Sequence, residues 1–308
     1  MDILLNLGLF ALALTVLLKG SDFFIDAAEK IGLSLGISPF VIGVTIVAAG
    51  TSLPELAASI VAVLDGNPEI VVGTVVGSNI ANILLVLGTV AIVAKYIRMD
   101  YNVMDVDMPL LVCSALLLWY VLYDSVVSIP EALVLIAGLI IFLITSFSSS
   151  EKDESIRPKA GWKAYAMLAV GGVMIYFGAD YTVLAITRLA EAAGIGQGVV
   201  ALTLVALGTS LPEVVVSIAA ARKGKPGIAV GNVLGSNIFN TYAVIGIPSL
   251  IAPLTVPEDI SAFGLPFMLG VTFLFAIVSV SNRISRWEGV MLLLFYAFFM
   301  VKMIESAV

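Results

Sequence analysis

Long apolar stretches recur along almost the whole chain, and they restrict the folds that it can adopt. Of the 308 residues, 60% are hydrophobic and only 12% are charged, and the mean hydropathy is +1.12. An α-helix of roughly 20 apolar residues crosses the hydrocarbon layer of a bilayer, which is about 30 Å thick. The residue-by-residue alternation of a transmembrane β-barrel is absent. The sequence therefore predicts an all-α integral membrane protein in a lipid bilayer.

Ten membrane-spanning helices are predicted from these stretches. They lie near residues 3–33, 39–64, 70–94, 107–122, 129–147, 162–192, 198–221, 228–251, 264–280 and 286–305. The first lacks a basic leading region, and Ser21, Asp22 and Glu29 interrupt it, so we interpret it as a retained helix and not as a signal peptide. A single cysteine, Cys113, and the absence of histidine exclude an intrachain disulfide and zinc sites of the usual Cys or His type.

The chain contains an internal repeat at an offset of 158 residues, which aligns Gly20–Gly88 with Gly178–Gly246 without a gap. We expect two halves, residues 1–147 and 162–308, joined by a polar cytoplasmic linker at 148–161. Each half holds five predicted spans. Because an odd number of spans reverses the direction of entry into the membrane, the pattern predicts two inverted five-helix repeats.

Charges in the turns indicate the orientation of these spans. The turn at residues 64–69 reads "LDGNPE" and is acidic, whereas the equivalent turn at 222–227 reads "RKGKPG" and is basic. With the N-terminus outside, the cytoplasmic ends of the spans carry Lys30, Lys95, Arg98, Lys152, Arg157, Lys159, Lys163, Arg222, Lys223, Lys225, Arg283 and Arg286. The positive-inside rule therefore predicts a multi-pass cell-membrane protein with both termini outside.

A carboxylate lies inside the second predicted span, in the sequence "GTSLPE" that ends at Glu55. Pro54 has no N–H to donate, so we expect free carbonyls around Gly50 and Thr51. An ionised side chain at this depth costs several kcal/mol unless it is paired. No Lys or Arg lies inside predicted spans two, three, seven or eight. A bound cation is then the simplest counter-charge.

The second half repeats this arrangement at Glu213, and each half adds a "GSNI-x-N" sequence. One such motif alone is also typical of helix packing. Together, the two halves offer the oxygens of Glu55, Glu213, Ser52, Ser210, Ser78, Ser236, Asn82 and Asn240. Hard oxygen ligands with two negative charges suit Ca²⁺, and Na⁺ should compete for them. Asp22 and Asp180 also repeat, but they lie nearer to span ends, which favours a solvated or interfacial role.

The paired "GTSLPE" and "GSNI-x-N" motifs, equally spaced in both halves, resemble those of the sodium/calcium exchanger family, and most of all its loop-poor prokaryotic members. The resemblance covers essentially the whole chain. It implies ten helices, with spans two, three, seven and eight forming an ion-binding core. It also implies that spans one and six, the longest here, are tilted and pack across that core. Because these two spans lack the proline break, we expect them to be the sliding elements.

The resemblance also implies roles for individual residues. Glu55 and Glu213 would be the central Ca²⁺ and Na⁺ ligands, and the carbonyls of Thr51 and Thr209 would complete the Ca²⁺ site. Flanking Na⁺ sites would use Ala48, Ser52 and Ser236 on one side and Ala206, Ser210 and Ser78 on the other. Asn82 and Asn240 would line the centre. Some prokaryotic members have an aspartate where Asn240 stands, so this chain has two central carboxylates and not three.

These observations predict an antiporter that exchanges Na⁺ for Ca²⁺ by alternating access. Ca²⁺ and Na⁺ are then its substrates, and we expect no cofactor, no nucleic acid and no protein partner. A Ca²⁺/H⁺ antiporter that uses the same glutamates is the alternative. A cation channel would need a ring of repeated filter loops, and an intramembrane enzyme would need a nucleophile with an activating base. The sequence shows neither feature.

Overall fold

Helices make up almost all of the computed structural model, which describes residues 2–94, 96–98, 107–148, 159–192, 210–258 and 260–307. The helical segments of the first half are α1 (Asp2–Leu35), α2 (Pro39–Ile42), η1 (Gly43–Val47), α3 (Ala48–Leu64), α4 (Glu69–Ala81), η2 (Asn82–Leu87), α5 (Gly88–Ala94), α6 (Asp107–Val121) and α7 (Ile129–Ser148). Those of the second half are α8 (Trp162–Ala192), α10 (Leu211–Arg222), α11 (Pro226–Phe239), η3 (Asn240–Val244), α12 (Gly246–Ser249), η4 (Ile260–Gly264), α13 (Leu265–Ser279) and α14 (Arg286–Ala307). Each η segment is a π-helix.

The predicted spans correspond to these helices. Among the described residues, eight stretches are long and apolar enough to cross a membrane, and several combine consecutive segments, such as α2, η1 and α3 over Pro39–Leu64. The shorter α6 lies at the predicted fourth span. The seventh is represented by α10, because the residues from 198 to 209 lie outside the described part of the chain. The all-α membrane fold is therefore confirmed.

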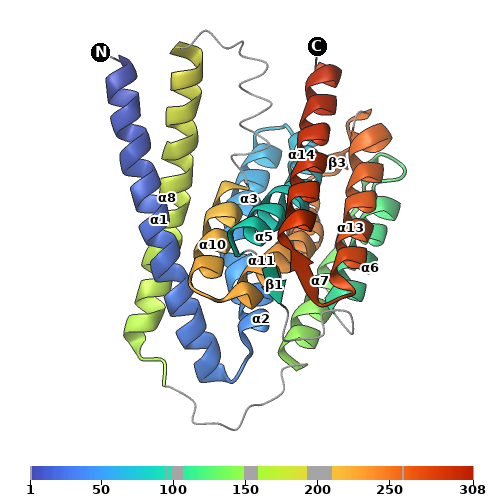
Figure 1. Cartoon of the computed structure of the whole chain (residues 1–308). Coiled ribbons are helices and arrows are strands. Elements are labelled where there is room, and N and C mark those ends of the chain that lie inside the picture. Colours follow the sequence, from blue (N-terminus) through green and yellow to red (C-terminus); the bar gives the residue numbers. More distant parts are fainter. Residues whose placement is uncertain are drawn as a thin grey trace.

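The longest described helices, α1 and α8, pack side by side and run in opposite directions. In Figure 1, α1 leaves the end of the molecule that carries both termini, whereas α8 returns towards that end. A Cβ atom on Gly20 would lie 2.6 Å from the Cβ atom of Met174, and one on Gly178 would lie 2.7 Å from the backbone nitrogen of Leu17. Only glycine permits so close an approach of the two backbones. The pair therefore forms one tightly packed unit.

The two equivalent turns fold in the same way in both halves. After α3, the N–H of Asn67 donates to the carbonyl of Ala62 at 2.9 Å, and after α10, the N–H of Lys225 donates to the carbonyl of Ala220 at 3.0 Å. The glycine before each of these donors has a positive φ, +82° and +72° respectively. This is the Schellman pattern that ends a helix at glycine. The repeat seen in the sequence is thus also a repeat of local structure.

Two short antiparallel strand pairs join the halves. β1 (Tyr96–Arg98) pairs with β4 (Arg283–Ser285), and β2 (Val126–Val127) pairs with β3 (Leu254–Thr255). In the first pair Tyr96 lies opposite Ser285. The residues equivalent to these two by the offset of 158 are Leu254 and Val127, and they lie opposite each other in the second pair. The two pairs are therefore equivalent cross-connections between the halves.

The centre of the molecule is formed by α11, η3 and α12 with the segments packed on them. Of the most apolar stretch within residues 226–249, 94% is buried, compared with 22% for that of α1. A Cβ atom on Gly235 would lie 2.1 Å from the carbonyl oxygen of Val44, and one on Gly231 would lie 2.4 Å from that of Phe40. The glycines of α11 thus let it contact the backbone that leads into α3. This contact places the "GTSLPE" segment of one half against the "GSNI-x-N" segment of the other.

Candidate functional site

Two carboxylates lie in the buried centre. Glu55 on α3 is 3% exposed, and Glu213 in the first turn of α10 is fully buried. Both side-chain oxygens of Glu55 and Oε2 of Glu213 accept no hydrogen bond from any described residue. No described lysine or arginine forms an ion pair with either group. The centre therefore holds two buried carboxyl groups with oxygens that no described residue uses.

Hydroxyl groups connect the two halves around these acids. Ser52 Oγ on α3 donates to Glu213 Oε1 at 3.4 Å. Thr51 Oγ1 lies 3.4 Å from Ser236 Oγ on α11, 3.1 Å from Asn232 Oδ1 and 3.3 Å from the carbonyl oxygen of Ala48. Thr51 and Ser52 of the first "GTSLPE" motif therefore face groups contributed by the second half, including Glu213 of the second motif.

Buried amides form a second layer beside the hydroxyls. Asn82 Nδ2 donates to Asn237 Oδ1 at 3.1 Å, and Asn79 Nδ2 lies 3.4 Å from the carbonyl oxygen of Asn237. Among the described groups, Asn82 Oδ1 and both polar side-chain atoms of Asn240 have no hydrogen-bond partner. A buried amide without a partner costs free energy of about 1–3 kcal/mol. The amide oxygens of Asn82 and Asn240 are thus available to a bound cation.

The backbone is also irregular at these amides. Asn82 is the first residue of the π-helix η2, and the equivalent Asn240 is the first residue of the π-helix η3. Single π-helical turns inside α-helices occur frequently at functional sites. The two halves therefore share an unusual backbone feature at equivalent residues.

The proline positions differ between the halves. Pro54 lies inside α3, which continues through it, and its missing N–H removes the partner that the carbonyl of Gly50 would have in a regular helix. The irregular backbone of this span precedes α3, in η1. In the second half, Pro212 lies in the first turn of α10, where a missing N–H costs nothing. The free carbonyls expected around Gly50 and Thr51 thus correspond to the local loss of one hydrogen bond within a continuous helix.

Ten of the twelve predicted site residues lie in the described part of the chain. All ten are buried, namely Glu55, Glu213, Thr51, Ser52, Ser210, Ser78, Ser236, Asn82, Asn240 and Ala48. The other two, Thr209 and Ala206, lie outside the described residues. In the described regions, no group of three or more His, Cys, Asp or Glu residues could hold a metal ion. A cation at this centre would depend on two carboxylates together with neutral oxygens.

Sequence reasoning missed several polar residues of the centre. Asn79 and Asn237 are the first asparagines of the two "GSNI-x-N" motifs and are equivalent by the offset of 158 residues, so their repetition was a usable signal. Asn232 Nδ2 donates to Ser217 Oγ at 2.9 Å while its Oδ1 faces Thr51. The residue equivalent to Asn232 is Thr74, so the repeat gave no such signal there.

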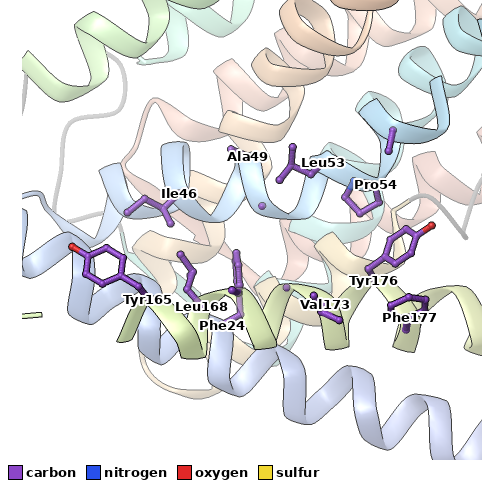
Figure 2. A pocket seen from close by; sticks show the side chains of 14 residues that line it. Phe24, Ile46, Ala49, Leu53, Pro54, Tyr165, Leu168, Val173, Tyr176 and Phe177 are labelled. Carbon is purple, nitrogen blue, oxygen red and sulfur yellow. The ribbon is translucent and has the colours of Figure 1, made fainter. Parts of the chain in front are cut away.

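A cavity of about 450 Å³ reaches Glu55 between the second halves of α3 and α8. Because α8 ends on the side of both termini, the cavity lies in that half of the molecule (Figure 1). A neighbouring apolar cavity of about 630 Å³ shares Pro54, Ala57 and Tyr176 with it. Figure 2 shows side chains of α3 and α8 facing each other across this second space. The two helices are thus separated along much of their length.

The sequence profile described as "Sodium/calcium exchanger protein" matches residues 5–148 and 163–304. The chain belongs to the sodium/calcium exchanger family. The exchanger is 35% identical to the sodium/calcium exchanger MaX1 of Methanosarcina acetivorans, over 97% of this chain and 98% of that protein. It is 32% identical to the putative antiporter CaxA of Alkalimonas amylolytica, over 91% of this chain and 93% of that one.

Solved structures agree with this membership. A structure of the sodium-calcium exchanger NCX_Mj soaked with Na⁺ and Sr²⁺ superimposes with a TM-score of 0.86 at 32% identity, covering 97% of this chain and 98% of that one. The exchanger is therefore a multi-pass membrane transporter of cations including Ca²⁺, and not an enzyme. Ions are its transported substrates, and the chemistry of exchange needs no cofactor.

Proposed function

We propose that this exchanger couples Na⁺ to Ca²⁺ in opposite directions by alternating access at one site around Glu55 and Glu213. The observation that carries the proposal is the pair of buried carboxylates whose oxygens lack partners among the described residues. A protein stabilises two such charges with cations, and no described basic side chain supplies one. The relatives' names support sodium as the coupling ion.

We assign the central ligands to Glu55 and Glu213, with carbonyls of Thr51 and Thr209 completing the Ca²⁺ site. Flanking Na⁺ positions would use Ala48, Ser52 and Ser236, and Ala206, Ser210 and Ser78. Asn82 and Asn240 line the centre between them. The unpartnered oxygens of Asn82 and Asn240 support this assignment. One Ca²⁺ or two Na⁺ would neutralise the two carboxylates, whereas a third Na⁺ would leave the site positive.

The packing supports a mechanism in which α1 and α8 move as one rigid pair relative to the other helices. The glycine contacts at Gly20 and Gly178 hold the two helices together, and the cavities between α3 and α8 leave space for movement. An empty site would carry two uncompensated charges through a low-dielectric seal, which is unfavourable. Bound ions remove that barrier, so exchange is favoured over uncoupled leakage.

We infer that both termini lie outside the cell membrane, with residues 1–147 and 162–308 as inverted halves and 148–161 as a cytoplasmic linker. Both termini lie at one end of the molecule, as this topology requires (Figure 1). The basic turn after α10 and the acidic turn after α3 support the direction of the assignment.

The test compares the two possible coupling ions. Purified exchanger is reconstituted in liposomes that contain Na⁺ or choline at equal internal and external pH, and ⁴⁵Ca²⁺ uptake is followed. We expect uptake only with internal Na⁺. Equal uptake in both would exclude Na⁺ coupling, and uptake that follows an imposed pH gradient without Na⁺ would establish the Ca²⁺/H⁺ alternative.

A further inference from the structure

The equivalent residues Asp22 on α1 and Asp180 on α8 have opposite surroundings. Asp180 lines the 450 Å³ cavity together with Glu55, and these two are the only charged residues among the described residues that line it. Asp180 is exposed and forms no ion pair with a described residue. A cation that approaches Glu55 through this cavity therefore passes a second free carboxylate.

At Asp22, by contrast, the positive charge of a lysine side chain already faces the carboxylate. The ammonium of Lys223 lies 3.2 Å from Asp22 Oδ1, donates to the backbone carbonyl of Asp22 at 3.1 Å, and lies 2.7 Å from Asp26 Oδ1. The neighbouring Lys225 pairs with Glu29 and lies 3.7 Å from Asp26 Oδ1. The turn between α10 and α11 is thus attached by two lysines to three acids on one face of α1.

This ionic cluster cannot form in the other half. The offset of 158 residues replaces Lys223 by Asp65 and Lys225 by Asn67. On α8 it replaces Asp26 by Leu184 and Glu29 by Thr187. Of the three acids on α1, only Asp22 has an acidic counterpart on α8, which is Asp180. The two halves therefore differ in sequence both at the turn and on the long helix that the turn would contact.

The cluster and the cavity occupy equivalent places at opposite ends of the ion site. The cavity separates α8 from α3, whereas α1 packs directly on α10, the counterpart of α3. A pathway through the cavity would therefore be open past Asp180, whereas the contacts of Lys223 and Lys225 with α1 would close the equivalent route past Asp22.

Building on the proposed exchange, we propose that Asp180 is an outer cation-binding residue of the open pathway, and that the Lys223 ammonium occupies the equivalent Asp22 while the opposite pathway is closed. Opening that second pathway separates Lys223 from Asp22 and exposes this carboxylate to arriving ions. Because α8 has no comparable cluster, the exchanger favours the state that is open on the side of its termini. The two residues thus act on opposite sides of the membrane.

The first test measures the half-saturating Ca²⁺ concentration for exchange from the side of the termini. Asp180→Asn should raise it about three- to ten-fold at low ionic strength, with little change in maximal rate, and the effect should shrink in high salt. Asp180→Glu should behave like the parent. Asp124→Asn is the matched control, because Asp124 precedes the β2–β3 pair at the same end of the molecule (Figure 1). An unchanged half-saturating concentration in Asp180→Asn would overturn this role.

The second test measures opening on the closed side without transport. In a Cys113→Ala background, a cysteine replaces Ala219, the counterpart of the cavity-lining Val61. The double change Lys223→Gln with Lys225→Gln should speed the reaction of the cysteine at position 219 with an impermeant thiol reagent several-fold. The control Lys302→Gln should not, because Lys302 pairs with Glu305 near the C-terminus. The charge exchange Lys223→Asp with Asp26→Lys should restore slow labelling. Unchanged labelling in the double variant would refute closure by the two lysines.

These outcomes are separable from the proposed function. The thiol reaction reports accessibility and requires no ion coupling. Sodium-driven uptake by the parent protein, measured in the same vesicles, tests exchange itself. If the parent exchanges Na⁺ for Ca²⁺ while both sets of variants behave like it, only the inference about Asp180 and Lys223 fails.

Discussion

Ser52 Oγ on α3 donates a hydrogen bond to Glu213 Oε1 on α10 across 3.4 Å, and this contact joins the two "GTSLPE" motifs at the centre of the exchanger. The two residues are 161 positions apart in the chain. Glu213 is therefore held by a group from the other half, so a change in the first half should alter ion binding at a carboxylate of the second.

Replacing Ser52 by alanine tests this contact. The change removes a hydroxyl oxygen and a hydrogen bond to a charged group, a contribution of about 1.5–3 kcal/mol. We expect the half-saturating Ca²⁺ and Na⁺ concentrations to rise roughly ten- to hundred-fold with normal expression. The control is Ser249→Ala, since Ser249 on α12 is also buried but donates only to the carbonyl of Ile245, the residue before that helix. Equal effects of both changes would remove Ser52 from the site.

The central acids allow a stronger test. Glu55→Gln and Glu213→Gln should each reduce Ca²⁺ transport by about 100-fold or more, because removal of one partner from a buried ion pair costs about 3–5 kcal/mol. Size-exclusion profiles should match those of the parent. Glu305→Gln, at an exposed position near the C-terminus, should transport normally. Near-normal exchange by either central variant would exclude that residue as a ligand.

Asn240→Asp would introduce a third acid beside Glu55 and Glu213. Like charges in a low-dielectric site disfavour simultaneous ionisation, so a proton should compete with the transported ions for the new group. We expect a steeper pH dependence of Na⁺-driven Ca²⁺ uptake than in the parent. Profiles from about pH 5.5 to 9 would be compared. Superimposable curves would place Asn240 outside the ion-coupled centre.

Orientation is tested with single cysteines in a Cys113→Ala background. Arg222→Cys and Asp65→Cys are both exposed, one in each of the two equivalent turns. With both termini outside, an impermeant reagent should label the cysteine at 222 only from the cytoplasmic face and the one at 65 only from outside. Labelling of both from one face would contradict the inverted repeat.

The close contact of α1 and α8 predicts a stability effect. In Gly178→Ala the new methyl group would lie 2.7 Å from the backbone nitrogen of Leu17, so the helices must separate. We expect a loss of about 1–3 kcal/mol, seen as a lower thermal unfolding midpoint in detergent. Gly270→Ala on α13 is the control, because no described atom lies within 4 Å of its added Cβ. An unchanged midpoint for Gly178→Ala would contradict the close contact between α1 and α8 at this residue.

Local patterns in the sequence predicted the fold and most of the candidate centre. Apolar length predicts the spans, and the repeat with its two acids predicts that Glu55 and Glu213 are equivalent. The first signal lies within about 20 neighbouring residues, the length of one membrane-spanning helix, and the second is a repeat at an offset of 158 residues that is read directly from the sequence.

Other features depend on contacts that neither half specifies alone. The π-helical turns beginning at Asn82 and Asn240 arise from a shift in backbone hydrogen bonding that side-chain hydropathy does not record. The pairing of Lys223 with Asp26 joins residues 197 positions apart. Asn232 faces Thr51 because glycines let α11 approach the segment before α3, a fit that depends on the assembled core.

The proposed exchange depends above all on one site, containing Glu55 and Glu213, that both ions share. The most direct measurement is equilibrium binding of ⁴⁵Ca²⁺ to the purified protein during a Na⁺ titration, for the parent and for the double variant Glu55→Gln with Glu213→Gln. We predict that Na⁺ displaces Ca²⁺ from the parent with a Hill coefficient above one, and that the double variant binds no Ca²⁺. Calcium binding that is insensitive to Na⁺, or that persists in the double variant, would contradict the shared site.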